Sequence, residues 1–127
     1  MSGLSEAEVV ARASFEAFKA GDRKAQEQFL AEDFTFTSPY DDGIDRAAYF
    51  QRCWPNHREV EDFEIERVVP DGEGAFVTYL FKSRRGLSFR NTEYLKVRRG
   101  RIVSAEVYFG ASYKDGAFVR KAEEAVA

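Results

Sequence analysis

The stretch FRNTEYLKVRRGRIVSAEVYFG, from Phe89 to Gly110, has the pattern of two β-strands joined by the tight turn RRGR. Because side chains alternate between the two faces of a strand, every second residue shares a face. One face of the first strand is mostly apolar, and it carries Phe89, Asn91, Glu93, Leu95 and Val97. The other face is mostly polar, with Arg90, Thr92, Tyr94 and Lys96. Burial of the apolar face would therefore place an amide and a carboxylate, Asn91 and Glu93, inside the protein.

Further strands are expected before and around this pair. Alternating or β-prone runs predict strands at residues 63–69, 75–83, 87–98 and 102–110. An earlier β-prone run, FTFTSP, ends at Pro39. The tail from Asp115 to Val126 is predicted as a short helix. We expect the strands to form one antiparallel or mixed sheet.

Three helices are expected in the first half of the chain. Apolar residues recur at helical spacing over residues 5–20, and Gly21 fits the position just past the end of that helix. Asp22 can cap a second, short helix, and Asp45 can cap a third over residues 46–54. On the third helix the face expected to be buried carries Ala47, Phe50 and Trp54.

The order of these elements predicts the fold class. Helices come first and long strands follow, which is typical of an α+β fold. Because sheets twist, this one is expected to curl over the three helices and enclose a core. The 127 residues have the usual length of one domain. We predict a single domain over residues 1–127, with a core at about 5–110 and a tail at 111–127.

The composition argues against several partners. The net charge is −3 without a basic block, so neither nucleic acid nor a membrane surface is expected to bind. No apolar run reaches the length of a membrane span and the first residues lack a signal-peptide pattern, so a cytoplasmic location is expected.

The single Cys53 excludes an internal disulfide, and the single His57 excludes a histidine-based metal site. Asp41, Asp42 and Asp45 lack the spacing of a calcium loop and fit turn and cap roles better. We expect no metal and no cofactor.

Two strands carry large apolar residues on both faces. The run AFVTYLFKS is one of them, and Tyr108 lies opposite the face that holds Val107 and Phe109. A sheet that packs on helices needs only one apolar face. We therefore predict a homodimer formed through the outer sheet face, with Tyr94 and Tyr108 in the contact. Aromatic residues that simply remain exposed to solvent are the alternative.

Three segments, FEAFKAGD, AEDFTFTSP and EYLKVRRGRIVSAEVYFG, resemble those of SnoaL-like domains. These domains belong to the nuclear transport factor 2-like superfamily, which includes the ketosteroid isomerases. The resemblance covers residues 5–110. It implies a cone-shaped, cystatin-like α+β barrel with a cavity between the curved sheet and the helices. It also implies frequent dimerisation through the sheet. One fold hosts many activities, so the resemblance does not assign a reaction.

The resemblance allows three positions to be compared with the catalytic positions of ketosteroid isomerases. In ketosteroid isomerases a carboxylic acid on this strand faces the cavity and donates to an oxyanion, and Glu93 lies at the matching position. The base position of that family, just before the proline that ends the first strand, is Ser38 here. The tyrosine position on the first helix is Ser14. Because serine cannot replace a carboxylate base unaided, ketosteroid isomerase chemistry is not expected.

The chain also resembles limonene epoxide hydrolases, which use an arginine and two carboxylates around a water. Here Asn91 stands in place of the arginine, and Val107 stands where a second inward carboxylate would be needed. Glu106 points to the other face by alternation. This activity is not expected either.

Glu93 remains the main candidate for chemistry, as a cavity carboxyl whose pKa is raised by burial. The alternative is a structural carboxylate that pairs with an arginine or accepts a hydrogen bond from a tyrosine. His57 in the loop WPNHRE and Tyr40 near the expected cavity mouth are candidates to assist it. Ligand-binding positions are predicted at Asn91, Ser38, Ser14, Phe36, Phe50, Trp54, Phe89 and Phe109.

Two classes of function stay open. The first is a cofactor-free isomerase, lyase, cyclase or hydrolase, and the second is a noncatalytic ligand-binding or assembly module of the same fold. The missing family bases favour binding, whereas Asn91 and Glu93 in apolar surroundings favour chemistry. In the enzyme and ligand-binding alternatives the expected partner is a small, mostly apolar molecule.

Overall fold

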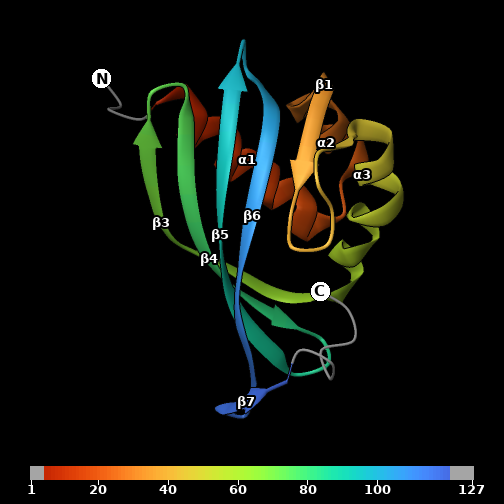
Figure 1. Ribbon diagram of the computed structural model, residues 1–127, viewed down its shortest axis with the longest axis vertical. Helices are drawn as coiled ribbons and strands as arrows, with labels where there is room; N and C mark the ends of the chain where they lie inside the picture. Colours follow the sequence, from red (N-terminus) through yellow and green to blue (C-terminus); the bar gives the residue numbers. More distant parts are fainter. Residues whose placement is uncertain (1–4, 121–127) are drawn as a thin grey trace.

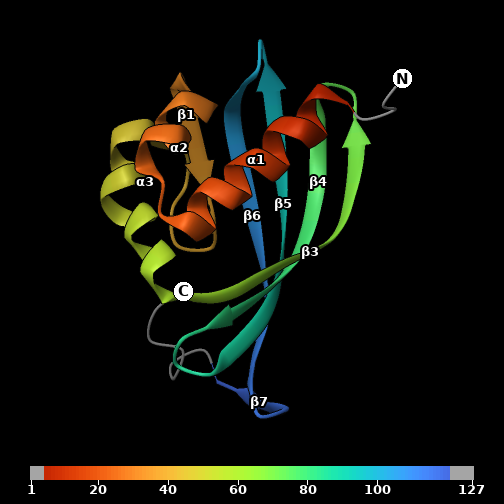
Figure 2. The same ribbon diagram turned by 180° about the vertical axis from the view of Figure 1, so that it is seen from behind.

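A layer of helices packs on one strongly curved sheet (Figures 1 and 2). A computed structural model describes residues 5–120. The strand order is β2-β1-β6-β5-β4-β3, and β7 pairs with β6 outside this path. β1 runs parallel to β6, and the other paired strands are antiparallel. The elements are α1 (Glu6–Ala20), α2 (Arg23–Phe29), β1 (Leu30–Thr37), β2 (Ile44–Asp45), α3 (Arg46–Arg52), the 3-10 helix η1 (Trp54–Glu59), β3 (Val60–Asp71), β4 (Gly74–Ser83), β5 (Leu87–Arg98), β6 (Arg101–Lys114) and β7 (Ala117–Val119).

The helices begin where their capping residues indicate. The Ser5 hydroxyl accepts an amide N–H of the first turn of α1 at 3.1 Å, and the carboxylates of Asp22 and Asp45 do the same for α2 and α3. Gly21 ends α1 in the left-handed conformation with φ +70°. A Cβ atom at Gly21 would lie 2.8 Å from the His57 ring, so both the backbone and the packing favour glycine there.

The third helix is shorter than predicted. α3 ends before Trp54, which begins η1, because Pro55 lacks the N–H that a continuing α-helix needs. Phe50 and Trp54 are buried as expected, but Ala47 is exposed. Tyr49 is buried instead, with an exposed fraction of 6%. The inward side of α3 is therefore centred on Tyr49 and Phe50.

The strands occupy the predicted positions, and several extend further. β6 continues to Lys114, and the tail then folds back as β7 rather than forming the predicted helix. Asp115 and Gly116 make this turn with φ values of +51° and +80°, which suit a tight hairpin. The part of the predicted helix at 121–126 lies outside the described residues.

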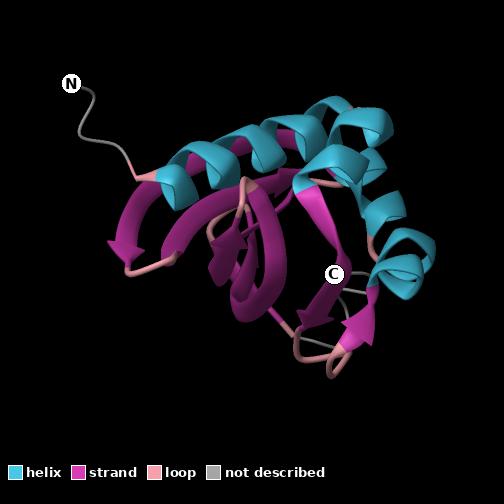
Figure 3. Ribbon diagram, turned by 90° about the horizontal axis from the view of Figure 1, so that it is seen from above, coloured by secondary structure: helices cyan, strands magenta, loops and turns pink. Residues whose placement is uncertain are grey.

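The helices cover one face of the curved sheet (Figure 3), and the buried core cluster contains residues of both layers. Phe34 and Leu30 of β1 and Ile102 of β6 are among its most completely buried side chains. Phe15 of α1 packs on the sheet through Tyr79, with 5.1 Å between ring centroids. In the described part of the chain, none of the helices is both long enough and apolar enough to cross a membrane.

The sheet face turned away from the helices also carries aromatic residues. Phe76 and Tyr94 are cross-strand partners whose ring centroids lie 4.7 Å apart. Tyr108 is opposite Thr92 on the next strand and is 57% exposed. The predicted second apolar face therefore exists and is accessible on this chain.

Candidate functional site

A cavity of about 690 Å³ lies between the sheet and the helices. Side chains from α1, α2, β1 and α3 form one part of its wall, and inward residues of the long strands form the rest. The strand register explains which sheet residues meet on the inward face. Two neighbouring rows across the sheet are Val77–Glu93–Val107 and Tyr79–Asn91–Phe109. Strand alternation therefore brings Glu93 and Asn91 to the cavity, as the sequence indicates.

Most of the predicted site residues line this cavity. They are Ser14, Phe36, Ser38, Tyr40, Phe89, Asn91, Glu93 and Phe109. Tyr40 is half-exposed, and its ring meets Phe109 edge-on at 5.4 Å. Three predicted residues, Phe50, Trp54 and His57, are not part of the wall.

These three residues serve packing instead, which corrects their assignment to the cavity. Phe50 and Trp54 lie in the core with their rings 5.9 Å apart. The His57 ring lies 4.9 Å from Trp54 and directly against Gly21. Partial burial, with Arg58 nearby, lowers the pKa of His57 from its ordinary value. This imidazole packs at the junction between the end of α1 and η1.

Glu93 is the central titratable group of the cavity. Burial raises its pKa to about 7, against a smaller opposing effect of the hydrogen bond from Tyr79. That hydroxyl donates to Glu93 Oε2 at 2.7 Å. Among the described residues no cation pairs with this carboxylate. Arg90, its neighbour on β5, lies on the other face and pairs with Glu66 at 2.7 and 3.0 Å.

Tyr79 links Glu93 to Asn91. The Asn91 amide nitrogen donates to the Tyr79 hydroxyl at 3.2 Å, and the Asn91 oxygen accepts the Gly110 N–H at 3.3 Å. Burial and the charge of Glu93 raise the pKa of Tyr79 well above its ordinary value, so this phenol stays protonated. Sequence reasoning missed Tyr79, although the alternation of AFVTYLFKS places it on the same face as Val77.

A second buried chain of hydrogen bonds reaches the cavity from the helices. The Ser14 hydroxyl on α1 donates to the Gln26 oxygen at 2.9 Å, and the Gln26 nitrogen donates to the Tyr49 hydroxyl at 3.3 Å. All three residues are buried and line the cavity. Burial raises the pKa of Tyr49, with a smaller contribution from the charge of Glu93. Sequence reasoning missed Gln26 and Tyr49 as site residues.

An ion pair between two cavity-lining residues joins α3 to the loop after β1. Arg52 of α3 lies 2.6 Å from Asp41, whose side chain is only 9% exposed. The backbones of Ser38 and Asp41 exchange two hydrogen bonds, at 2.7 and 3.2 Å, which fix the loop. Burial, then the charge of Asp41, raises the pKa of the Cys53 thiol to about 12. Asp41 therefore does more than form the turn predicted for it.

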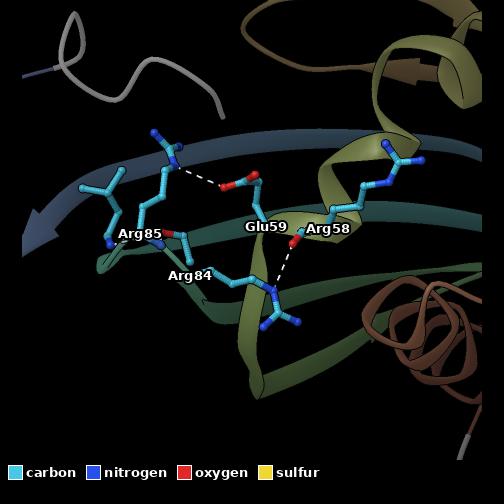
Figure 4. A network of polar contacts seen from close by, with 6 residues as sticks. Arg58, Glu59, Arg84 and Arg85 are labelled. Carbon is cyan, nitrogen blue, oxygen red and sulfur yellow. Dashed lines mark hydrogen bonds and ion pairs between the residues drawn. The ribbon is translucent and has the colours of Figure 1, made fainter.

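A second set of polar contacts joins η1 to the β4–β5 hairpin (Figure 4). Arg85 donates to the Glu59 carboxylate at 3.1 Å, and both residues line the cavity. Arg84 donates to the Arg58 carbonyl at 3.0 Å. The two ion pairs that line the cavity, Asp41–Arg52 and Glu59–Arg85, are thus each internally neutralised. Within residues 5–120, no group of three or more His, Cys, Asp or Glu side chains is arranged to hold a metal ion.

Comparison with known proteins identifies the family. The model of the SnoaL-like domain matches residues 11–105, so the chain belongs to the SnoaL-like domain family. No curated protein is similar enough in sequence to count as a relative.

Solved structures confirm the predicted fold. A proposed ketosteroid isomerase from Kribbella flavida superposes with a TM-score of 0.70 at 19% identity, covering 96% of this chain and 88% of that one. IdmH, a proposed polyketide cyclase from Streptomyces antibioticus, gives a TM-score of 0.73 at 16% identity, covering 83% of this chain and 92% of its own. An NTF2-like protein of unknown function from Cytophaga hutchinsonii gives a TM-score of 0.68 at 17% identity, covering 86% of this chain and 94% of that one. At these identities the likeness shows the nuclear transport factor 2-like α+β cone and no particular reaction.

Proposed function

We propose that this protein binds a small, mostly apolar molecule in its cavity and transfers a proton to or from it without a cofactor, with Glu93 as the acid–base group. The candidate reactions are those of an isomerase, lyase, cyclase or hydrolase. The proposal is consistent with the fold of the two neighbours that carry enzyme names, but it rests on the site of this chain.

The state of Glu93 carries the proposal. A carboxyl with a pKa of about 7 is present in both protonation states near neutral pH. Acid–base catalysis works best when the pKa of the group lies near the working pH. Tyr79 occupies Oε2, and in the described part of the chain Oε1 makes no hydrogen bond. That oxygen is therefore free to exchange a proton with a ligand in the adjacent space.

A purely ligand-binding role is the second candidate, and the surroundings of Ser38 favour it. This hydroxyl accepts the Tyr40 N–H at 3.1 Å, as in an ordinary turn, so it does not act as a base. The nearby Asp41 carboxylate is neutralised by Arg52. A reaction that needs a second strong base would then fail, and the cavity would serve to hold or carry its ligand.

Proton exchange from bound molecules tests the proposal without knowledge of the product. Neutral cyclic ketones and enones are incubated with the protein in D2O at pH 7, and loss of their acidic C–H signals is followed by proton NMR. We expect the wild type to accelerate exchange for at least one bound compound, and Glu93→Gln to abolish the acceleration while retaining binding. Binding without acceleration by the wild type would leave only the ligand-binding role. If no compound bound, the proposed proton transfer on such compounds would be refuted.

A further inference from the structure

Two hydrogen-bond chains reach the cavity, one from the sheet and one from the helices. The first ends in a hydrogen-bond acceptor and the second in a hydrogen-bond donor. The chain on the sheet runs from Asn91 through Tyr79 to the Glu93 carboxylate, which is an acceptor when ionised. The chain on the helices runs from Ser14 through Gln26 to the Tyr49 hydroxyl. What the second chain offers to a ligand depends on its direction.

The direction of the hydrogen bonds from Ser14 through Gln26 leaves the Tyr49 hydroxyl proton without an acceptor among the described residues. The Gln26 oxygen receives the Ser14 proton, so the Gln26 nitrogen is the atom turned toward Tyr49. An amide nitrogen only donates, and the Tyr49 oxygen therefore acts as the acceptor. Among the described residues nothing accepts the proton of that hydroxyl. A buried donor without a partner costs free energy, so a ligand that accepts this proton gains an interaction the empty site lacks.

The charges around the cavity restrict the ligand further. Asp41 pairs with Arg52 at 2.6 Å and Glu59 pairs with Arg85 at 3.1 Å, so these four lining residues add no net charge. Glu93 is the one charged lining group left without an opposite charge in the described part of the chain. When ionised it repels an anion, and among the described lining residues no cation is left unpaired to hold a ligand carboxylate.

We propose that Tyr49, positioned by Gln26, donates a hydrogen bond to an oxygen of the ligand, and that the ligand is an uncharged molecule with a strong acceptor oxygen, such as a carbonyl compound. This inference rests on the proposed function of the cavity and names its substrate class. Tyr49 is then the specificity-determining residue, and Gln26 is a positioning residue that acts through it.

Two probes of the same shape test this assignment. trans-2-Decalone carries a carbonyl and trans-decalin does not, and their dissociation constants are measured by NMR titration against the wild type and the variants. The ratio of the two constants within each protein is compared between proteins, which cancels the different hydration of the probes. We expect Tyr49→Phe to reduce the preference for the ketone about 3- to 10-fold, the usual effect of one hydrogen bond. The matched control Tyr94→Phe, on the outer sheet face, leaves the preference unchanged.

A vibrational measurement separates positioning from folding. At pH 9 the Glu93 carboxyl is ionised and cannot donate, so a hydrogen bond to the ketone must come from another group. We expect the infrared stretch of carbonyl-13C-labelled 2-decalone to lie at lower wavenumber in the wild type than in Tyr49→Phe. Gln26→Leu keeps the Tyr49 phenol but removes the hydrogen bond that orients it. The carbonyl band should therefore broaden and shift partway toward its position in Tyr49→Phe.

The outcomes distinguish this inference from the proposed function. Equal ketone preference in wild type and Tyr49→Phe, or an unshifted carbonyl band while both probes bind, overturns the role of Tyr49 and leaves the cavity function intact. That result would mean that the Gln26 amide is reversed and takes the Tyr49 proton itself. If neither probe binds the wild type up to its solubility limit, the cavity does not take small apolar molecules, and the proposed function fails as well.

Discussion

Replacing Glu93 by glutamine should change how the stability of this protein depends on pH. In the folded chain the pKa of Glu93 is about 7, against an ordinary value of 4.5. Between these two values the unfolded chain has released the proton and the folded chain still holds it. Because the folded state binds more protons, its stability falls as pH rises from 4.5 to about 7 and then levels off. Glutamine has no proton to lose in this range, so Glu93→Gln should remove that fall.

The size of the effect follows from the displacement of the pKa. A rise from 4.5 to about 7 corresponds to about 3 kcal/mol at 1.36 kcal/mol per unit. Glu93 lines the cavity and is only half-buried, which should reduce this figure, so we expect about 1–3 kcal/mol. The glutamine oxygen still accepts from Tyr79, so this hydrogen bond is retained in a neutral form. Glu93→Gln should therefore match the wild type near pH 4.5 and exceed it by this amount at pH 8.

Urea unfolding at pH 4.5, 6, 7 and 8, followed by circular dichroism, measures these differences. The control is Glu66→Gln on the outer face, where the hydrogen bond from Arg90 lowers the carboxylate pKa. This variant should keep the wild-type fall between pH 4.5 and 7. A Glu93→Gln protein less stable than the wild type by a few kcal/mol at pH 8 would refute the reasoning. Glu93 would then be a structural carboxylate whose ionised form the fold stabilises.

Three further predictions follow from the same contacts. Tyr79→Phe removes the hydrogen bond that favours the ionised form of Glu93, so an NMR titration should find the pKa of Glu93 higher than in the wild type; a lower value would contradict this. Phe34→Ala truncates a side chain that is 2% exposed and should lower the free energy of unfolding by about 3–5 kcal/mol, whereas a loss below about 1 kcal/mol would place Phe34 outside the core. We propose that the outer sheet face forms a homodimer, so Tyr108→Asp should yield monomers in sedimentation velocity; a wild type that is monomeric at micromolar concentration would disprove the contact.

Much of the fold could be predicted because local patterns and tertiary structure agree in this chain. The predicted caps Asp22 and Asp45 satisfy backbone groups that any helix leaves open, and their carboxylates do so here. Over residues 115–120 the tail does not form the predicted helix, because Asp115 and Gly116 make a turn with positive φ values. This pair favours a hairpin, and β6 continues far enough to supply the partner strand.

The polar pair of the candidate site, Asn91 and Glu93, could be predicted because a single strand determines it. Alternation along β5 is enough to place Asn91 and Glu93 on the inward face. Tyr79 joins them through the register of the β4–β5 hairpin, which alternation within one strand does not give. Tyr49 and Gln26 come from two separate helices whose rotation is set by packing. The spacing of apolar residues on the third helix gave the wrong centre of its buried face, and Tyr49 was therefore missed.

The protonation of Glu93 is the property on which the acid–base proposal depends. The direct measurement is a carbon-13 NMR titration of the side-chain carboxyl carbons in protein labelled at glutamate, with Glu93→Gln used to assign the signal. We predict a titration near pH 7, displaced upward by burial in a cavity that offers the carboxylate no cation. A value at or below 4.5 would contradict the account, because Glu93 would then be a permanently ionised structural group.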